Sequence, residues 1–220
     1  MRRIVRTFGL LLLPPALFVP VGIAFSVARQ TPPDATSVPW ILAITEVLLA
    51  GLALLWLSRW RYRAVDIGAT GYRPRLLLFG IVTGIALALS YEAAVSPALD
   101  WLRGNIGDFV PPAETRRALG SARVPFVIAN VLFAPFVEEL IYRGLLERRL
   151  SELWSTRASF FWGALGFGLL HWAGGVFYIL ATGLLGASLL WLRRRTGSLW
   201  TSTAAHFAFN TLEVVLSFAR

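Results

Sequence analysis

The sequence contains no cysteine and no lysine, has only two histidines and carries little charge, with 15% Asp, Glu, Lys and Arg. Without cysteine there is no disulfide framework, no thiolate nucleophile and no Cys-ligated metal site. Without lysine there is no Schiff base and no P-loop lysine. Soluble domains carry about 25% charged residues and ~45–50% apolar ones, whereas 56% of this chain is hydrophobic. The composition therefore predicts an integral membrane protein whose first partner is the lipid bilayer.

Hydrophobic runs divide the 220 residues into about seven segments. A membrane-spanning helix needs ~20 mostly apolar residues, and most of the runs approach that length. The expected helices cover residues 7–28, 40–57, 76–95, 124–146, 158–173, 176–192 and 198–218. We therefore predict an all-α membrane protein, a polytopic bundle of about seven transmembrane helices that forms a single membrane domain over residues 1–220. Pro14, Pro15 and Pro20 predict a kink in the first helix.

The first run has a second interpretation. Three arginines precede it, and Ser26-Val27-Ala28 resembles the small-residue cleavage site of a secretory signal peptide. Residues 1–28 are therefore either a retained helix or a signal peptide. In both cases the chain that follows begins outside, so the topology is the same.

Arginine supplies the whole positive charge, and its distribution indicates topology. The net charge of +9 would suit nucleic acid, but the arginines cluster between hydrophobic runs, so we expect no nucleic-acid partner. With the N-terminus in the cytoplasm, fourteen arginines fall on the cytoplasmic side and six outside, as the positive-inside rule expects. This predicts a cytoplasmic N-terminus and an external C-terminus. An arginine-only chain is also typical of a GC-rich genome, which favours a bacterial plasma membrane.

The stretch FVEELIYRGLLERRL places charges inside an apolar run. Glu139 and Arg143 are four residues apart, so on a helix they share one face and can pair. Glu138 points about 100° away from them and has no local cation. Ionisable side chains at membrane depth usually mark a functional site or a pairing partner. The pattern therefore indicates a structural role for Glu139 and leaves the Glu138 carboxylate available for chemistry.

Both histidines of the chain, His171 and His206, fall in predicted helices, and Asn210 shares a helix face with His206. With Glu138 as general base on a water, His171 as its partner, and His206 and Asn210 as oxyanion donors, the set is complete for hydrolysis. A second reading is zinc, with Glu138, His171 and His206 as ligands and an open water position. The helical positions raise one difficulty. At 1.5 Å per residue, Glu138 and His206 lie about 12 Å from the cytoplasmic edge and His171 nearer 20 Å.

Three motifs stand in order: Glu138-Glu139-x-x-x-Arg143, Phe167-x-x-x-His171 and His206-x-x-x-Asn210. Together they resemble the signature of the CPBP family, the CAAX-protease and bacteriocin-processing (Abi) membrane proteins. The resemblance covers residues 124–218 as a four-helix catalytic core and leaves residues 1–123 as N-terminal helices and an outer connection.

The resemblance implies an intramembrane endopeptidase, a metalloprotease or a glutamate-dependent enzyme, that cuts a membrane-associated peptide or protein. Its eukaryotic relatives act on prenylated CAAX proteins. It also implies that Glu138 and His171 activate water, that His206 and Asn210 stabilise the oxyanion, and that Glu139 and Arg143 support the site.

Two other function classes stay open. A non-proteolytic membrane partner, such as a bacteriocin-immunity or scaffold protein, would use the polar cluster only to hold helices together. A transporter would use buried Glu and His as a proton relay, although the two-half repeat of many transporters is not evident. The remaining acidic residues of the apolar runs, Glu46, Glu92 and Glu213, are expected near interfaces or paired with polar groups. Asn130 lies about two turns before Glu138 and is expected to line the same cavity.

Overall fold

The computed structural model describes residues 2–30, 36–107 and 122–219, and the regular structure in these ranges is helical. In chain order the segments are α1 (Arg2–Arg29), α2 (Val38–Trp60), α3 (Pro74–Ser90), η1 (Tyr91–Val95), α4 (Ser96–Asn105), α5 (Arg123–Val127), η3 (Ile128–Phe133), α6 (Ala134–Glu139), η4 (Leu140–Leu146), α7 (Glu147–Leu153), α8 (Thr156–Leu170), η5 (Trp172–Gly174), α9 (Val176–Thr196) and α10 (Leu199–Ala219). Among these, η1, η3 and η4 are π-helical turns and η5 is a 3₁₀ turn.

The predicted polytopic helical bundle is confirmed. Within the described ranges, five helices are long and apolar enough to cross a membrane: Leu11–Arg29, Val38–Trp60, Pro74–Asn105, Arg123–Leu153 and Val176–Thr196. The other two expected spans are helices α8 and α10. Helix α8 has 15 residues, which is short of the ~20 that span a bilayer. Helix α10 has 21 residues but is more polar, since it carries His206, Asn210 and Glu213.

Several helix boundaries differ from the sequence prediction. The fifth helix was expected to reach residue 173, but it ends at Leu170 and the chain turns through η5 before α9 begins. The third and fourth expected helices are longer than predicted, because each continues through π-helical turns into α4 and α7. Of the outer connection, α4 is helical, and residues 108–121, with Arg116 and Arg117, lie outside the described ranges.

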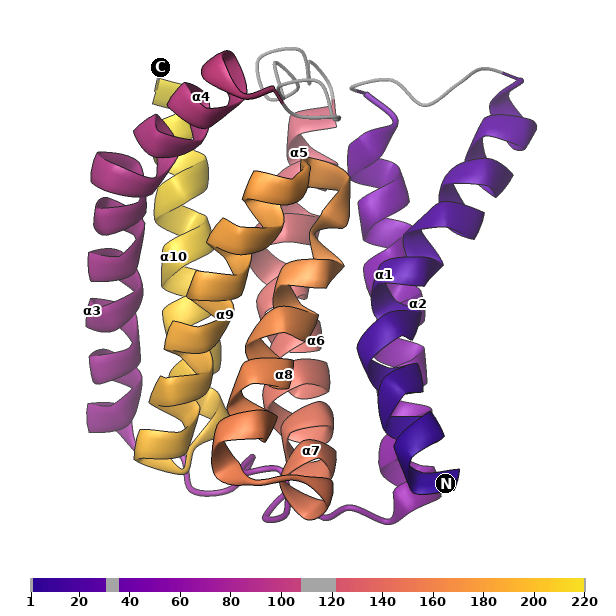
Figure 1. Cartoon of the computed structure of the whole chain (residues 1–220), viewed down its shortest axis with the longest axis vertical. Helices are drawn as coiled ribbons and strands as arrows, with labels where there is room; N and C mark the ends of the chain where they lie inside the picture. Colours follow the sequence, from indigo (N-terminus) through magenta and orange to yellow (C-terminus); the bar gives the residue numbers. More distant parts are fainter. Residues whose placement is uncertain (1, 31–35, 108–121, 220) are drawn as a thin grey trace.

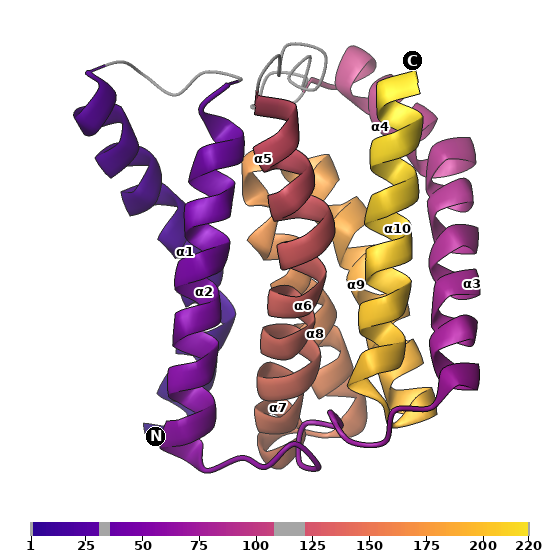
Figure 2. The ribbon, with the colours of Figure 1, turned by 180° about the vertical axis from the view of Figure 1, so that it is seen from behind.

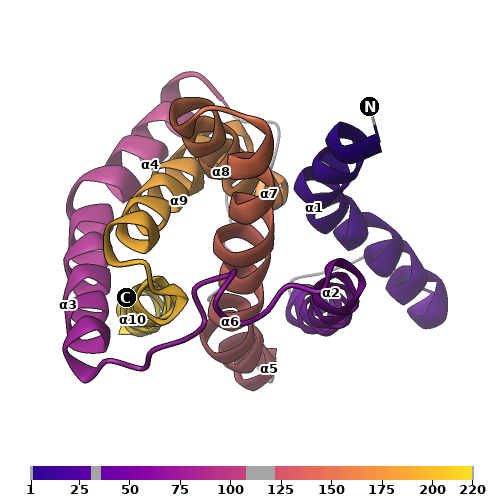
Figure 3. The same cartoon turned by 90° about the horizontal axis from the view of Figure 1, so that it is seen from below.

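The long rod formed by α5, η3, α6, η4 and α7 lies in the middle of the bundle (Figure 3). Helices α1 and α2 lie on one side of it, and α3, α8, α9 and α10 lie on the other (Figures 1 and 2). Helix α1 bends away from α2 in its second half, as its prolines predict. The largest apolar core joins Leu11 of α1 and Leu49 of α2 to Ile141, Leu145 and Phe167 across the rod. The N-terminal helices thus pack directly against the segment that carries the glutamates.

Helix α10 packs closely along α3, because two glycines of α3 face its backbone. A Cβ atom at Gly84 would overlap the carbonyl oxygen of Ala205, and one at Gly80 would overlap that of Thr201. Small residues at a membrane-helix interface let two backbones approach each other. This contact sets the position of the helix that carries His206 and Asn210.

Candidate active site

Glu138 and Glu139 end helix α6, and both are buried. The predicted ion pair forms: Arg143 Nη1 lies 3.1 Å from Glu139 Oε1, and both side chains are at most 2% exposed. Arg143 also donates from Nη2 to the carbonyl oxygen of Gly186 (3.1 Å) and stacks on the Phe167 ring, 4.0 Å from its centroid. The guanidinium is thus held by a charge, a carbonyl and an aromatic face, which offsets the cost of burying it. Among the described residues Glu138 forms no ion pair with Arg143, although the charges of Arg143 and Glu139 act on it.

His206 of α10 connects the two glutamates. Its Nδ1 lies 3.2 Å from Glu139 Oε1, and its Nε2 lies 3.9 Å from Glu138 Oε2. Because an ionised carboxylate only accepts hydrogen bonds, Nδ1 of His206 donates to Glu139. Nε2 is therefore the ring nitrogen that faces Glu138. Glu139, which was expected to pair with Arg143 and to support the site, also contacts this histidine.

Asn210 lies one turn after His206 and donates from Nδ2 to the carbonyl oxygen of Asn130 (2.7 Å). That carbonyl is available because of the proline in the next turn. In η3 the amide of Ala134 bonds to Ala129 instead of Asn130, and Pro135, the next candidate donor, has no N–H. The amide nitrogen of Asn210 carries two hydrogens, so one remains for a second acceptor.

His171 follows the last residue of α8, where the helix leaves carbonyl groups without intrahelical donors. Its own amide bonds to Gly168, and its ring Nδ1 lies 3.0 Å from the Phe167 carbonyl oxygen. Because a carbonyl oxygen only accepts, Nδ1 carries the hydrogen and Nε2 keeps its lone pair. The Phe167 ring lies between both histidines, with centroid distances of 5.0 Å to His171 and 5.6 Å to His206. Phe167 therefore packs against the site itself.

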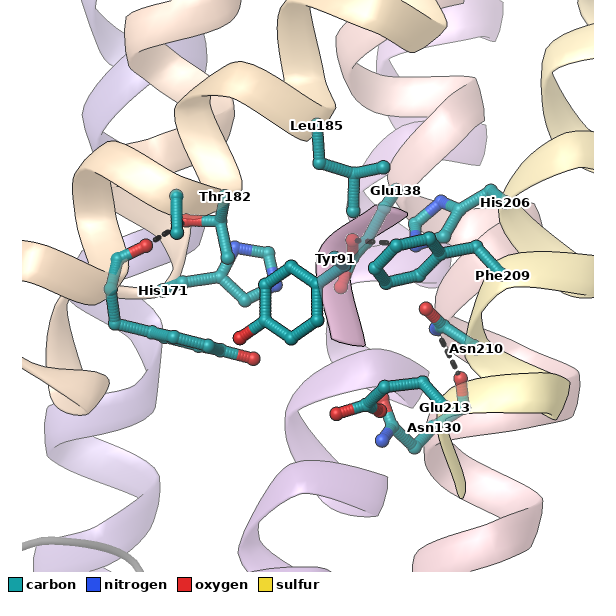
Figure 4. A pocket seen from close by; sticks show the side chains of 12 residues that line it. Tyr91, Asn130, Glu138, His171, Thr182, Leu185, His206, Phe209, Asn210 and Glu213 are labelled. Carbon is teal, nitrogen blue, oxygen red and sulfur yellow. Dashed lines mark hydrogen bonds and ion pairs between the residues drawn. The ribbon is translucent and has the colours of Figure 1, made fainter. Parts of the chain in front are cut away.

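The four predicted site residues line one cavity of about 60 Å³. Figure 4 shows Glu138, His171, His206 and Asn210 approaching it from three separate parts of the fold. One water needs roughly 10–15 Å³ by this measure, so the cavity can hold a few waters. Within the described part of the chain, Glu138 Oε2 is buried and has no hydrogen-bond partner. The expected difference in depth does not separate the residues, because His171, directly after α8, lines the same cavity as Glu138 and His206.

Several residues of the cavity were not singled out as site residues from the sequence. Tyr91 of η1 and Tyr178 of α9 contribute aromatic rings, and Glu213 contributes a second carboxyl, while Asn130 lines the cavity as expected. Behind Glu138, Glu46 of α2 is 2% exposed and interacts electrostatically with it. Its Oε2 has no hydrogen-bond partner in the described ranges. Glu46 was expected near an interface; the signal that could have marked it was its place inside an apolar helix.

A zinc ion would need Glu138, His171 and His206 as a converging ligand set, with each N or O atom about 2.0–2.2 Å from the metal. Across the described ranges, no group of three or more His, Cys, Asp or Glu side chains is arranged to hold a metal ion. Nδ1 of each histidine is used in a hydrogen bond, which leaves Nε2 as the ring nitrogen that could face a metal ion.

The segment that carries Glu138, His171, His206 and Asn210 resembles a known protein family. Residues 120–212 match the family described as type II CAAX prenyl endopeptidase Rce1-like. This segment is therefore Rce1-like, and the resemblance to the CPBP/CAAX protease family is confirmed. The match supports a protease in a membrane environment. Comparison with curated proteins and with solved structures gives no match.

Proposed function

We propose that the protein is an intramembrane endopeptidase that hydrolyses a peptide bond of a membrane-associated or CAAX-like substrate. The observation that carries this proposal is the cavity inside the helix bundle, where two acceptors and two donors meet around room for water. The acceptors are Oε2 of Glu138, which accepts no hydrogen bond within the described ranges, and Nε2 of His171. The donors are Asn210 and His206. The Rce1-like match supports the same reaction class.

The first step is activation of a water. A water in the cavity donates one hydrogen bond to Glu138 and one to Nε2 of His171, which aims its lone pair at the scissile carbonyl carbon. As the oxygen attacks, Glu138 takes the proton and acts as general base. Burial in a site of low dielectric strengthens these interactions relative to water.

The second step is collapse of the tetrahedral intermediate. Its oxyanion accepts a hydrogen bond from Nδ2 of Asn210 and one from Nε2 of His206. Since Nδ1 of His206 donates to Glu139, the second bond requires His206 as an imidazolium, whose charge the ionised Glu139 stabilises. Glu138 then gives its proton to the leaving amine as the C–N bond breaks.

The test compares purified wild type with Glu138→Gln and Glu138→Ala on membrane-associated peptides, including prenylated CAAX peptides. Glu152→Gln is the matched control, because Glu152 lies on the surface at the end of the bundle. Loss of a general base lowers kcat by about 10²–10⁴-fold, whereas the control should keep wild-type kcat. Equal cleavage by wild type and Glu138→Gln would refute the role of Glu138. Absence of cleavage by folded wild type, with partner binding unchanged in Glu138→Gln, would favour the non-proteolytic membrane partner.

Metal dependence has its own measurement. The protein is treated with a chelator, its metal content is determined, and cleavage is assayed again. Full activity in metal-free protein would exclude a metalloprotease. Activity that is lost with the metal and returns with added zinc would overturn the metal-free mechanism above.

We also propose that the end of the bundle holding residues 61–73 faces the cytoplasm and that the C-terminus lies outside. Exposed arginines gather at this end: Arg61, Arg63, Arg73, Arg75, Arg148, Arg157 and Arg195. The chain has no cysteine, so single cysteines report on topology without further changes. In intact cells, a membrane-impermeant thiol reagent should label Gly104→Cys and not Ala64→Cys. The reverse pattern would invert the topology.

A further inference from the structure

The turn between α8 and α9 carries His171 and has a defined conformation. It consists of His171, the 3₁₀ turn η5 and Gly175, whose φ of +96° suits glycine. Two internal hydrogen bonds close it, from the Gly174 amide to the His171 carbonyl (2.9 Å) and from the Gly175 amide to the Trp172 carbonyl (3.0 Å). A side chain at Gly174 would overlap the Tyr178 ring, so the turn lies flat against α9. The position of the His171 ring therefore depends on where this turn is held.

Two side-chain hydrogen bonds hold the turn from outside. Trp172 Nε1 donates to the carbonyl oxygen of Pro15 in α1 (3.0 Å). Arg103 Nη2, from α4, donates to the carbonyl oxygen of Gly174 (2.8 Å). Both bonds are partly buried, and both join segments that lie far apart in the sequence. The two bonds come from different helices and hold the turn at two points, Trp172 and Gly174. Together they restrain the turn more than either bond alone.

We propose that α1 and α4 position His171, and that Trp172 and Arg103 are the positioning residues that transmit this effect. Both helices lie outside residues 120–212, the segment that matches the protease family. The site is thus completed by a part of the chain that the family resemblance does not cover. This inference rests on the proposed function, in which His171 and Glu138 share the attacking water.

The expected effect follows from the geometry of that water. Nε2 of His171 and the Glu138 carboxylate must both reach it, and a misplacement of about 1 Å can cost 10²-fold in rate. When either bond is lost, Nδ1 of His171 can still bond to the Phe167 carbonyl oxygen. The turn that carries the ring is then less restrained, so Nε2 moves away from its position beside the water. We expect Trp172→Phe and Arg103→Gln each to lower kcat by about 10- to 100-fold and to leave KM within about threefold. Because both bonds restrain one turn, the double variant should lose less than the product of the two single effects.

Trp172→Phe keeps an aromatic ring and removes only the N–H donor, so it is the sharper variant. Trp101→Phe is the matched control, because Trp101 lies on α4 and is 62% exposed. It should keep wild-type kcat, KM and thermal stability. If Arg103→Gln does not fold, Trp172→Phe alone still tests the proposal.

A second measurement does not depend on proteolysis. The chain has only two histidines, so protein labelled with ¹⁵N-histidine gives two imidazole patterns, which His171→Gln assigns. We expect Trp172→Phe and Arg103→Gln to shift or broaden the His171 ring signals and to leave those of His206 unchanged. Unchanged His171 signals in both folded variants would overturn the proposal, as would wild-type kcat.

The two proposals fail in different ways. Inactive wild-type protein whose His171 signals respond to Trp172→Phe would remove the protease function and keep the positioning effect. Active wild type that loses activity in Glu138→Gln but not in Trp172→Phe would keep the protease and remove the positioning role.

Discussion

Replacing Glu139 by glutamine removes one half of the buried ion pair with Arg143 at almost constant side-chain volume. The arginine, 2% exposed, would keep the Gly186 carbonyl and the Phe167 ring face but lose its only ion-pair partner identified in the described ranges. Breaking a buried pair by removing one partner costs about 3–5 kcal/mol, because a charge is left uncompensated. We expect Glu139→Gln to lower the free energy of unfolding by an amount in this range.

The double variant Glu139→Leu/Arg143→Met tests the cause of that loss. Replacing a whole buried pair by apolar residues is often neutral or stabilising, by about 1–4 kcal/mol. The double variant should therefore be at least about as stable as wild type and clearly more stable than Glu139→Gln. It should still be inactive, because Nδ1 of His206 has lost its carboxylate. The comparison of Glu139→Gln with the double variant would then show that stability can be restored without restoring activity.

Unfolding in mixed detergent micelles, followed through the fluorescence of the nine tryptophans, measures these differences. The rest of the chain is left unchanged, so the variants share one reference state. A loss below about 1 kcal/mol for Glu139→Gln would show that the pair is solvated, which contradicts the burial described above. A double variant as unstable as the single one would show that packing, and not charge, dominates.

Three further predictions concern the elements around the cavity. Asn210→Ala removes the proposed oxyanion donor and should lower kcat by about 10²–10³-fold with little change in KM, as measured by peptide cleavage. Pro135→Ala restores an N–H that competes for the Asn130 carbonyl; kcat should fall while the melting temperature stays the same or rises, and unchanged kcat would argue against the proline explanation. Gly84→Val overlaps the Ala205 carbonyl and should destabilise the fold by at least about 1–3 kcal/mol, as seen in detergent unfolding.

The sequence predicted the features that depend on helix periodicity. Glu139 and Arg143 pair because residues four apart share a helix face, and the same rule placed Asn210 beside His206. Hydrophobic run length predicted the helices, since bilayer thickness sets how many apolar residues a span needs. The gathering of all four site residues at one cavity was expected only through the order and chemistry of the three motifs. Periodicity along one helix says nothing about which helices meet.

The features that the sequence did not predict depend on tertiary packing and on backbone deviations. The end of α8 at Leu170 lies in an apolar run with no helix-stopping residue before Gly174. The π-helical turns η3 and η4 widen the rod locally, and helix periodicity does not predict them. The burial of Glu46 against Glu138 requires α2 to pack on the rod, which no local pattern reveals. Such local irregularities are frequent at functional sites.

The size of the cavity has a consequence for turnover. A volume of about 60 Å³ accommodates a few waters or one peptide group, but not the side chains on either side of a scissile bond. For the proposed endopeptidase, the cavity therefore has to widen before a substrate peptide can enter it. The frequency of that opening then sets an upper limit on the rate, as conformational steps do in many enzymes. Membrane thickness and lateral pressure act on the separation of helices, so we expect the rate of the proposed cleavage to depend on the bilayer.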